Sequence, residues 1–191
     1  MSAKKAKAKP EALSCFVLDF PDHPDIRYMR YYWKNDGYQA GIKAAVLNKL
    51  TPAGHSAARS DVLLPETAPG EYASLAHLLE RYDSTKPLTE RTGYVQFNIY
   101  LPPERPIHAG WENIRSWAMS YFVQKLQMAA ILVLHAPYQA GSGNASHVHV
   151  IIPGRRVAAN GFAQTARDVC SDAGAADAIA HWRSFTSDAL A

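Results

Sequence analysis

The chain has 191 residues, 48% of them hydrophobic, and a formal net charge of +3. This length and composition allow one domain with a hydrophobic core and argue against several domains. Every apolar run is much shorter than the ~20 residues that a membrane-spanning helix needs, so no membrane insertion is expected. Cys15 and Cys170 stand far apart without a metal-binding or redox spacing, which predicts reduced thiols in a cytoplasmic protein.

The N-terminal segment is basic, with lysines at positions 4, 5, 7 and 9. Its composition predicts a disordered arm over residues 1–12, followed by one domain over residues 13–191. Such an arm suits a solvated tail that aids solubility, and it also suits contact with nucleic acid. The sequence leaves both roles open.

Residues 14–20 are rich in apolar side chains and end at a proline-containing cluster, which favours a first strand. Residues 25–38 begin with an Asp able to cap a helix and reach a Gly able to end one, which predicts a helix. This segment places tyrosines among Arg27, Arg30 and Lys34. Interleaved aromatic and basic side chains suit single-stranded nucleic acid, whereas an ordinary amphipathic helix with half-buried tyrosines explains the same pattern.

The rest of the chain predicts a mixture of helices and strands. Helices are expected at residues 39–50, 70–81, 109–127, 164–172 and 175–190, with a polar loop at 51–60 and an extended segment at 61–69. Residues 93–101 alternate as a strand does, with Gln96, Asn98 and Tyr100 on one face and an apolar face toward the core. Apolar runs at 131–134 and 148–152 predict two adjacent strands. This order predicts an α+β fold, with a central antiparallel sheet and flanking helices.

Three of the eight histidines lie at the ends of the last two predicted strands. His147 and His149 project from the same face, because side chains alternate along a strand. His135 ends the preceding strand, so pairing of the two strands would bring it beside the other two. Three imidazoles with open coordination positions are typical of a reactive metal site and not of a closed structural one.

The pattern His135…His147-Val148-His149 resembles the metal-binding motif of HUH endonucleases, and more narrowly that of the MobA/MobL family of relaxases. Other stretches are similar to that family in the same order, and they cover most of the chain from about residue 15 to residue 185. They are Leu63-Leu-Pro65-Glu-Thr-Ala-Pro69, the helix, spacer and strand from Glu80 to Pro102, Pro153-Gly-Arg155-Arg156, and Asn160-Gly161-Phe162. The shared order of these motifs carries the resemblance.

The resemblance implies a plasmid-mobilisation relaxase, which nicks single-stranded DNA at an origin of transfer and holds the cut strand on a tyrosine through a 5′-phosphotyrosyl bond before rejoining it. It implies a divalent ion, Mn²⁺ or Mg²⁺, on the three histidines. Relaxosome accessory proteins and a type IV secretion coupling protein are the implied partners, in the cytoplasm of a bacterium.

The family's nucleophile motif is similar to Tyr32-Trp-Lys-Asn35-Asp36-Gly37, which implies Tyr32 as the nucleophile. Tyr38 and then Tyr31 are the alternatives. Cations on both sides of the chain are expected to contact the DNA, namely Arg27, Arg30, Lys34, Arg155 and Arg156.

Two departures from the family pattern bear on activity. Ala145-Ser146 replaces a proline before the histidine pair, and Gln96 and Asn98 stand where some members carry an acidic residue. A DNA-binding accessory of the same fold, with reduced or no nicking activity, is therefore one alternative.

A histidine-triad nucleotide hydrolase is the other alternative, because its motif is similar to residues 143–155. Its third histidine position is occupied here by Ile151, and His135 has no place in that motif. Short motif matches of this kind have a high false-positive rate.

Overall fold

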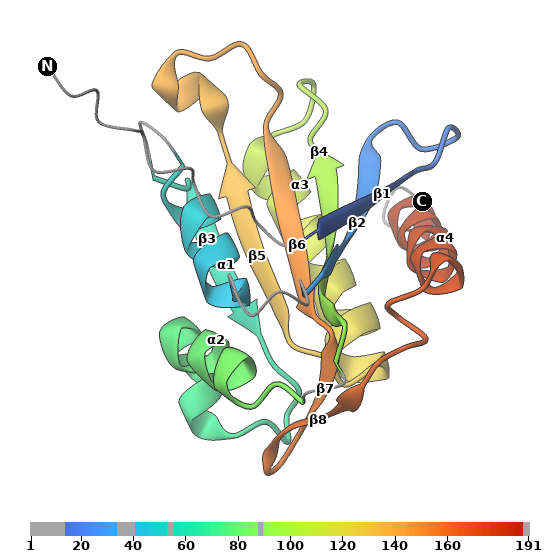
Figure 1. The fold of residues 1–191 in the computed structure, drawn as a ribbon. Helices are drawn as coiled ribbons and strands as arrows, with labels where there is room; N and C mark the ends of the chain where they lie inside the picture. Colours follow the sequence, from blue (N-terminus) through green and yellow to red (C-terminus); the bar gives the residue numbers. More distant parts are fainter. Residues whose placement is uncertain (1–13, 34–40, 53–55, 88–89, 189–191) are drawn as a thin grey trace, which may run out of the picture.

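The computed structural model describes residues 14–33, 41–52, 56–87 and 90–188 (Figure 1). The basic arm expected at residues 1–12 lies outside this part of the chain, and so do Lys34 and Tyr38. The strands are β1 (Ser14–Asp19), β2 (Ile26–Tyr32), β3 (Arg59–Leu63), β4 (Thr92–Tyr100), β5 (Ala130–His135), β6 (His147–Pro153), β7 (Arg155–Ala158) and β8 (Gly161–Thr165). The helices are α1 (Ile42–Leu50), α2 (Leu75–Ser84), α3 (Ile107–Ala118) and α4 (Asp172–Asp188), with 3₁₀ helices η1 (Gly70–Ala73) and η3 (Pro137–Ala140) and a π-helix η2 (Met119–Lys125).

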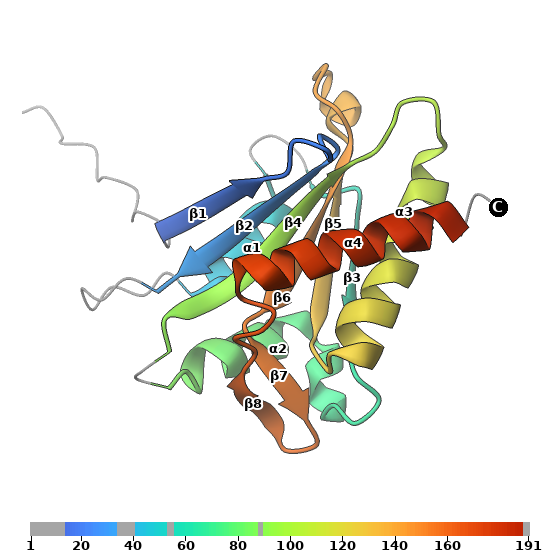
Figure 2. The same ribbon diagram turned by 90° about the vertical axis from the view of Figure 1, so that its right-hand side faces the viewer.

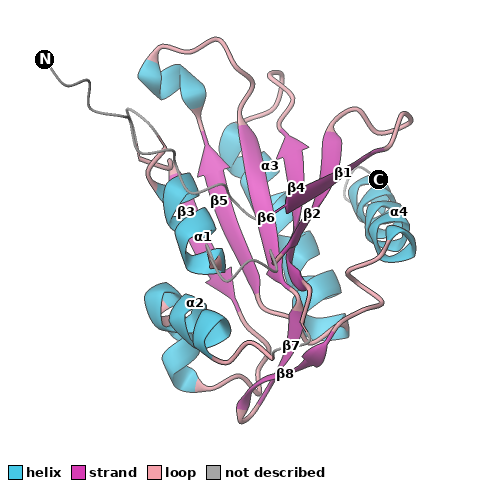
Figure 3. Ribbon diagram, viewed as in Figure 1, coloured by secondary structure: helices cyan, strands magenta, loops and turns pink. Residues whose placement is uncertain are grey.

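Strands β1 to β6 form one sheet in the order β1-β2-β4-β6-β5-β3, and every neighbouring pair is antiparallel (Figure 3). Strands β7 and β8 form a separate hairpin. This hairpin lies at the end of the sheet opposite the β5–β6 connection (Figure 1). The α+β prediction, with a central antiparallel sheet and flanking helices, is confirmed.

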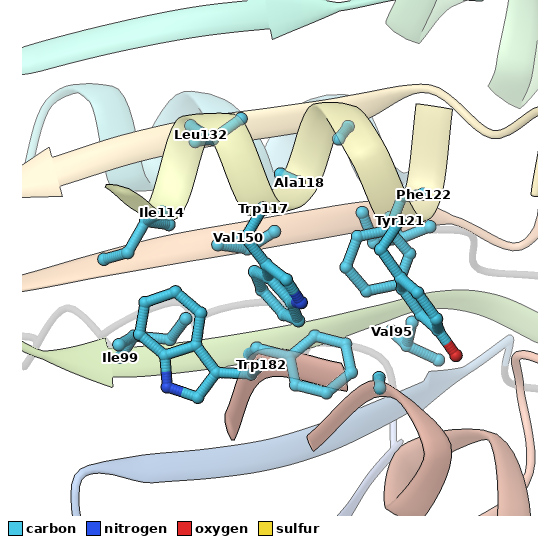
Figure 4. Close-up of a cluster of buried hydrophobic side chains, with 14 of the residues drawn as sticks. Val95, Ile99, Ile114, Trp117, Ala118, Tyr121, Phe122, Leu132, Val150 and Trp182 are labelled. Atoms are coloured by element: carbon cyan, nitrogen blue, oxygen red, sulfur yellow. The ribbon is translucent and has the colours of Figure 1, made fainter. Parts of the chain in front are cut away.

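Helices cover both faces of the sheet (Figures 1 and 2). Helices α3 and α4 bury their apolar sides against one face, where Trp117 packs edge-on against Phe97. Trp117 also packs edge-on against Trp182 (Figure 4). Helices α1 and α2 pack against the other face around Tyr94 and Ile151. Two hydrophobic cores therefore enclose the central strands, and the predicted apolar face of residues 93–101 lies in the α3–α4 core.

Strand β2 corrects the prediction of a helix over residues 25–38. It pairs with β1 on one side and β4 on the other, and Tyr28 packs against Phe97 with ring centroids 5.2 Å apart. Ile26 and Tyr28 are buried in the α3–α4 core while Met29 is buried on the opposite face. A central strand with both faces covered loses the polar–apolar alternation on which recognition from sequence depends.

The predicted helix at residues 164–172 is also wrong. Residues 161–165 form β8 and pair with β7, so cross-strand pairing overrides the local helical pattern. The final helix begins at Asp172, three residues before the predicted start at 175. Strand β3 likewise begins inside the segment predicted as a polar loop, because it pairs with β5 along its length.

The predicted long helix at 109–127 exists, but its second half is a π-helix, η2. Trp111, Ile114, Ala118 and Tyr121 are buried along it, as their helical spacing predicts. No helix within the described ranges is both long enough and apolar enough to span a membrane.

Candidate metal centre

The pairing of β5 with β6 places the three histidines together. His135 lies directly opposite His147 in the register, and Val133 lies opposite His149, so all three imidazoles stand on the face that α1 and α2 cover. Their ring centroids are 4.6 to 5.1 Å apart. The strand-pairing prediction for these residues matches this placement.

Each imidazole has one ring nitrogen beside an oxygen acceptor. His149 Nδ1 lies 2.6 Å from the Asn98 side-chain oxygen, His135 Nε2 lies 2.6 Å from the Lys49 carbonyl oxygen, and His147 Nδ1 lies 3.0 Å from the Ala145 carbonyl oxygen. A carbonyl oxygen only accepts hydrogen bonds, so these contacts assign the N–H to the contacting nitrogen. The Gln96 side-chain nitrogen also lies 3.2 Å from His149 Nδ1, and the shorter contact with the Asn98 oxygen decides the assignment there. The lone pairs are therefore on His149 Nε2, His135 Nδ1 and His147 Nε2.

These assigned nitrogens fit a shared metal ion. His149 Nε2 and His135 Nδ1 lie 3.3 Å apart. Two nitrogens that each bind one ion at ~2.1 Å stand about 3 Å apart, so this pair already has a suitable separation. The candidate ligand atoms of all three histidines lie within 4.8 Å of one another. Outer acceptors of this kind fix the tautomer and orientation of metal-binding histidines.

Burial keeps His149 in its neutral form, in which a ring nitrogen is free to bind a metal ion. His149 is only 7% exposed, and this burial lowers the pKa of its imidazole to about 2. The Lys49 ammonium and the other two histidines lower the same pKa further. An all-imidazole donor set suits a divalent transition-metal ion better than Mg²⁺, which prefers oxygen ligands.

Helix α1 supplies the carbonyl that contacts His135, and a residue of α2 fixes the start of that helix. The Asp83 carboxylate accepts hydrogen bonds from the backbone amides of Ile42 (3.0 Å) and Lys43 (3.1 Å). A Cβ at Gly41 would lie 1.9 Å from this carboxylate, so the close approach requires glycine there. The last turn of α1 then reaches the histidines at Lys49.

Asn98 and Tyr100 extend the site onto β4. They lie opposite His149 and His147 in the register, and the Asn98 oxygen also accepts a hydrogen bond of 2.6 Å from the buried Gln96 amide. The Tyr100 ring lies 5.6 Å from that of His147 and is 36% exposed. Alternation in the sequence predicts that the β4 residues share a face, but the register that sets them beside the histidines comes only from the fold.

The structure does not bring Tyr32 to this cluster. Tyr32 lies opposite Thr92, whereas His149 lies opposite Asn98 on the same strand. Along β4 this is about 20 Å, at ~3.3 Å per residue. Tyr31 is half-buried against Tyr94, with stacked rings 4.3 Å apart. Tyr38, the other predicted nucleophile, lies outside the described residues.

The predicted DNA-contacting arginines of β2 face different ways. Arg27 lies opposite Asn98, on the histidine face, and forms an exposed ion pair of 3.1 Å with Asp19. Arg30 lies on the other face, where its guanidinium donates to the Cys170 carbonyl and to Asp172. Arg27 is therefore near the metal cluster and Arg30 is not, while Lys34 lies outside the described residues.

The two arginines that follow β6 are engaged in internal contacts. Arg155 is 2% exposed, donates to the backbone carbonyls of Tyr82 and Thr85, and lies between the rings of Tyr82 and Phe162. Its side chain is therefore inaccessible to DNA in this structure. Arg156 donates to the Leu126 carbonyl and forms an ion pair of 2.6 Å with an exposed aspartate.

Comparison with known proteins gives a fold likeness. No protein-family model matches the sequence, and no curated protein matches it significantly. The chain is similar to a solved structure described as "Molecular Basis of Vancomycin Resistance Transfer in Staphylococcus aureus", with a TM-score of 0.57. The two are 18% identical over 68% of each chain. The likeness shows a shared fold.

Proposed function

We propose that this protein is a relaxase of the MobA/MobL type, which nicks single-stranded DNA at an origin of transfer in the bacterial cytoplasm. The observation that carries the proposal is the convergence of three imidazole nitrogens, with assigned lone pairs, on one face of a sheet whose fold is similar to that of a resistance-transfer protein. A divalent ion bound there would polarise a phosphodiester group and stabilise negative charge on its oxygens.

Protein residues around the cluster suit an anionic substrate. The Lys49 ammonium is close enough to His149 to lower the pKa of its imidazole, and Arg27 stands on the same sheet face. Both cations favour a phosphate beside the histidines. The half-buried Asn98 and the buried Gln96 hold the His149 ring in place and supply no negative charge that would repel the DNA.

Tyr100 is our preferred nucleophile among the described tyrosines, because its ring contacts a histidine of the cluster and is partly exposed. In the proposed step the phenol oxygen bonds to phosphorus while the bond from phosphorus to the 3′ oxygen breaks. The phenol proton passes to solvent, and the departing 3′ oxygen takes up a proton. The phosphotyrosyl bond retains the energy needed to rejoin the strand. Tyr38 and Tyr32 remain the candidates that the family resemblance implies.

The position of Ile151 argues against the histidine-triad hydrolase. That side chain occupies the third position of the strand's histidine pattern and is fully buried between Ile131 and Gln96 in the register. It belongs to the α1–α2 core, so β6 does not continue its histidine row. The DNA-binding accessory without nicking activity differs from the relaxase only in its chemistry and is separated by experiment.

The test is a covalent-adduct assay with single-stranded origin-of-transfer oligonucleotides and Mn²⁺ or Mg²⁺. We expect a metal-dependent protein–DNA adduct that is lost in His149→Ala and kept in His108→Ala, a change at an exposed histidine elsewhere. Peptide mass spectrometry should place the DNA on Tyr100, and Tyr100→Phe should remove it. DNA binding without an adduct under any metal would refute the nicking activity and support the accessory protein.

A further inference from the structure

A cavity of about 740 Å³ lies at the end of the sheet opposite the histidines. Its walls come from Tyr32 at the end of β2, the start of β4, strand β8 and Arg167. The β7–β8 hairpin lies at this end of the sheet (Figure 1). Thr92 lines the cavity and lies about 20 Å along β4 from Asn98, which contacts His149. The cavity is therefore separate from the metal cluster.

Two arginines and one carboxylate line the cavity, so its described charged side chains carry a net positive charge. Arg91 and Arg167 line it, both are exposed, and neither forms an ion pair with any described residue. The acidic residue in the wall, Glu90, is buried and its carboxylate accepts hydrogen bonds from the Thr92 amide (3.0 Å) and the Thr165 hydroxyl. The Glu90 carboxylate is thereby held in the wall by two donors, while neither guanidinium has an acidic partner among the described residues. Arginine suits phosphate because its planar fork matches two oxygens.

Tyr32 adds an aromatic surface to the same cavity. The Arg30 guanidinium lies 5.6 Å from the centre of its ring. Arg30 is itself fixed by hydrogen bonds to the Cys170 carbonyl (2.8 Å) and to Asp172 (2.7 Å). The Tyr32 ring therefore contacts a guanidinium whose position is fixed. Aromatic rings in a cationic groove stack on nucleic-acid bases with little preference for sequence.

We propose that this cavity binds one nucleotide unit, with its base against Tyr32 and its phosphate between Arg91 and Arg167. The unit comes either from a free nucleotide or from a DNA strand that also reaches the histidines. At ~3.4 Å per stacked nucleotide, about six nucleotides cover the ~20 Å between the two sites. The strand-bound form rests on the function proposed above, whereas the cavity itself does not.

The experiment measures binding in EDTA, so that the result is independent of the metal centre and of nicking. Deoxyadenosine monophosphate is titrated by calorimetry, and labelled oligonucleotides of 4 and 12 nucleotides by fluorescence anisotropy. The Arg91→Ala/Arg167→Ala double variant should weaken binding by about 10- to 100-fold, since each charge-assisted contact contributes roughly tenfold. Arg183→Ala, a change at an exposed arginine on α4, should leave binding unchanged.

Two substitutions of Tyr32 distinguish a stacking role of its ring from a chemical role of its hydroxyl group. Tyr32→Phe keeps the ring and should bind as the wild type does, whereas Tyr32→Ala should lose about tenfold. Nucleotide binding lost in the double variant supports a free-nucleotide site. Loss with the 12-mer alone supports the strand-bound form. Equal affinities of the wild type and the double variant for every probe would overturn the cavity as a nucleotide site, and would leave the metal-dependent adduct assay unaffected.

Discussion

Asn98 offers the sharpest test of the metal centre, because it contacts the site without being a ligand. Its side-chain oxygen lies 2.6 Å from His149 Nδ1 and accepts a second hydrogen bond of 2.6 Å from Gln96. In Asn98→Ala the buried His149 N–H loses the oxygen that accepts from it, so Nε2 is held less firmly as the ligating nitrogen. Loss of such an outer contact typically weakens metal binding by ~10- to 100-fold. This corresponds to about 1.4–2.8 kcal/mol of binding free energy.

The assay is calorimetric titration with Mn²⁺ at pH 7.5, with circular dichroism to verify folding. Asn98→Asp keeps an acceptor and adds a negative charge, so it should bind Mn²⁺ at least as tightly as the wild type does. Asn113→Ala, the same change at a half-buried asparagine on α3, should leave the affinity unchanged. If Asn98→Ala binds Mn²⁺ with wild-type affinity, the assigned tautomer of His149 and the reasoning from it are wrong.

Three further predictions concern the stability of the fold and the burial of side chains outside the two sites. Asp83→Ala removes the side-chain cap of α1 and should lower the free energy of unfolding by about 1–2 kcal/mol in urea, whereas the exposed Asp177→Ala should change it little. Burial raises the pKa of the Cys170 thiol to about 12, so this thiol stays protonated at pH 8. Ellman's reagent should therefore label only the exposed Cys15 until urea unfolds the chain. Rapid labelling of both cysteines in the folded protein would contradict this. Arg155→Met leaves buried carbonyl groups without a donor and should cost about 2–4 kcal/mol in urea unfolding; if it instead weakens DNA binding with unchanged stability, Arg155 contacts DNA.

Local sequence patterns predicted the strands whose side chains alternate between polar and apolar, and the strands that form continuous apolar runs. The alternation of residues 93–101 predicted β4, and the runs around the histidines predicted β5 and β6. The pattern failed where both faces of an element are buried, as in β2, and where a partner strand decides the conformation, as in β8. Strand pairing joins segments far apart in the chain, so a local window does not contain it.

Some residues of the candidate site were likewise predictable from local patterns, and others were not. The spacing of His147 and His149 fixed their common face, and the position of His135 at a strand end predicted its approach. Asn98 was visible in the sequence as a polar residue on a half-buried strand, but its role depends on lying opposite His149. The distance of Tyr32 from the cluster follows from β2 being a strand that runs the length of the sheet.

The sequence by itself determined the α+β class and the candidate cluster of three histidines, because both rest on the alternation of side chains along short strands. Tertiary structure decided what surrounds those histidines. The register of β4 against β6 set Asn98 and Tyr100 beside them, and helix α1 brought the Lys49 carbonyl to His135. The same register left Tyr32 with Arg91 and Arg167 at the far end. Side-chain period is a local property, whereas register and helix docking are fixed by packing across the whole sheet.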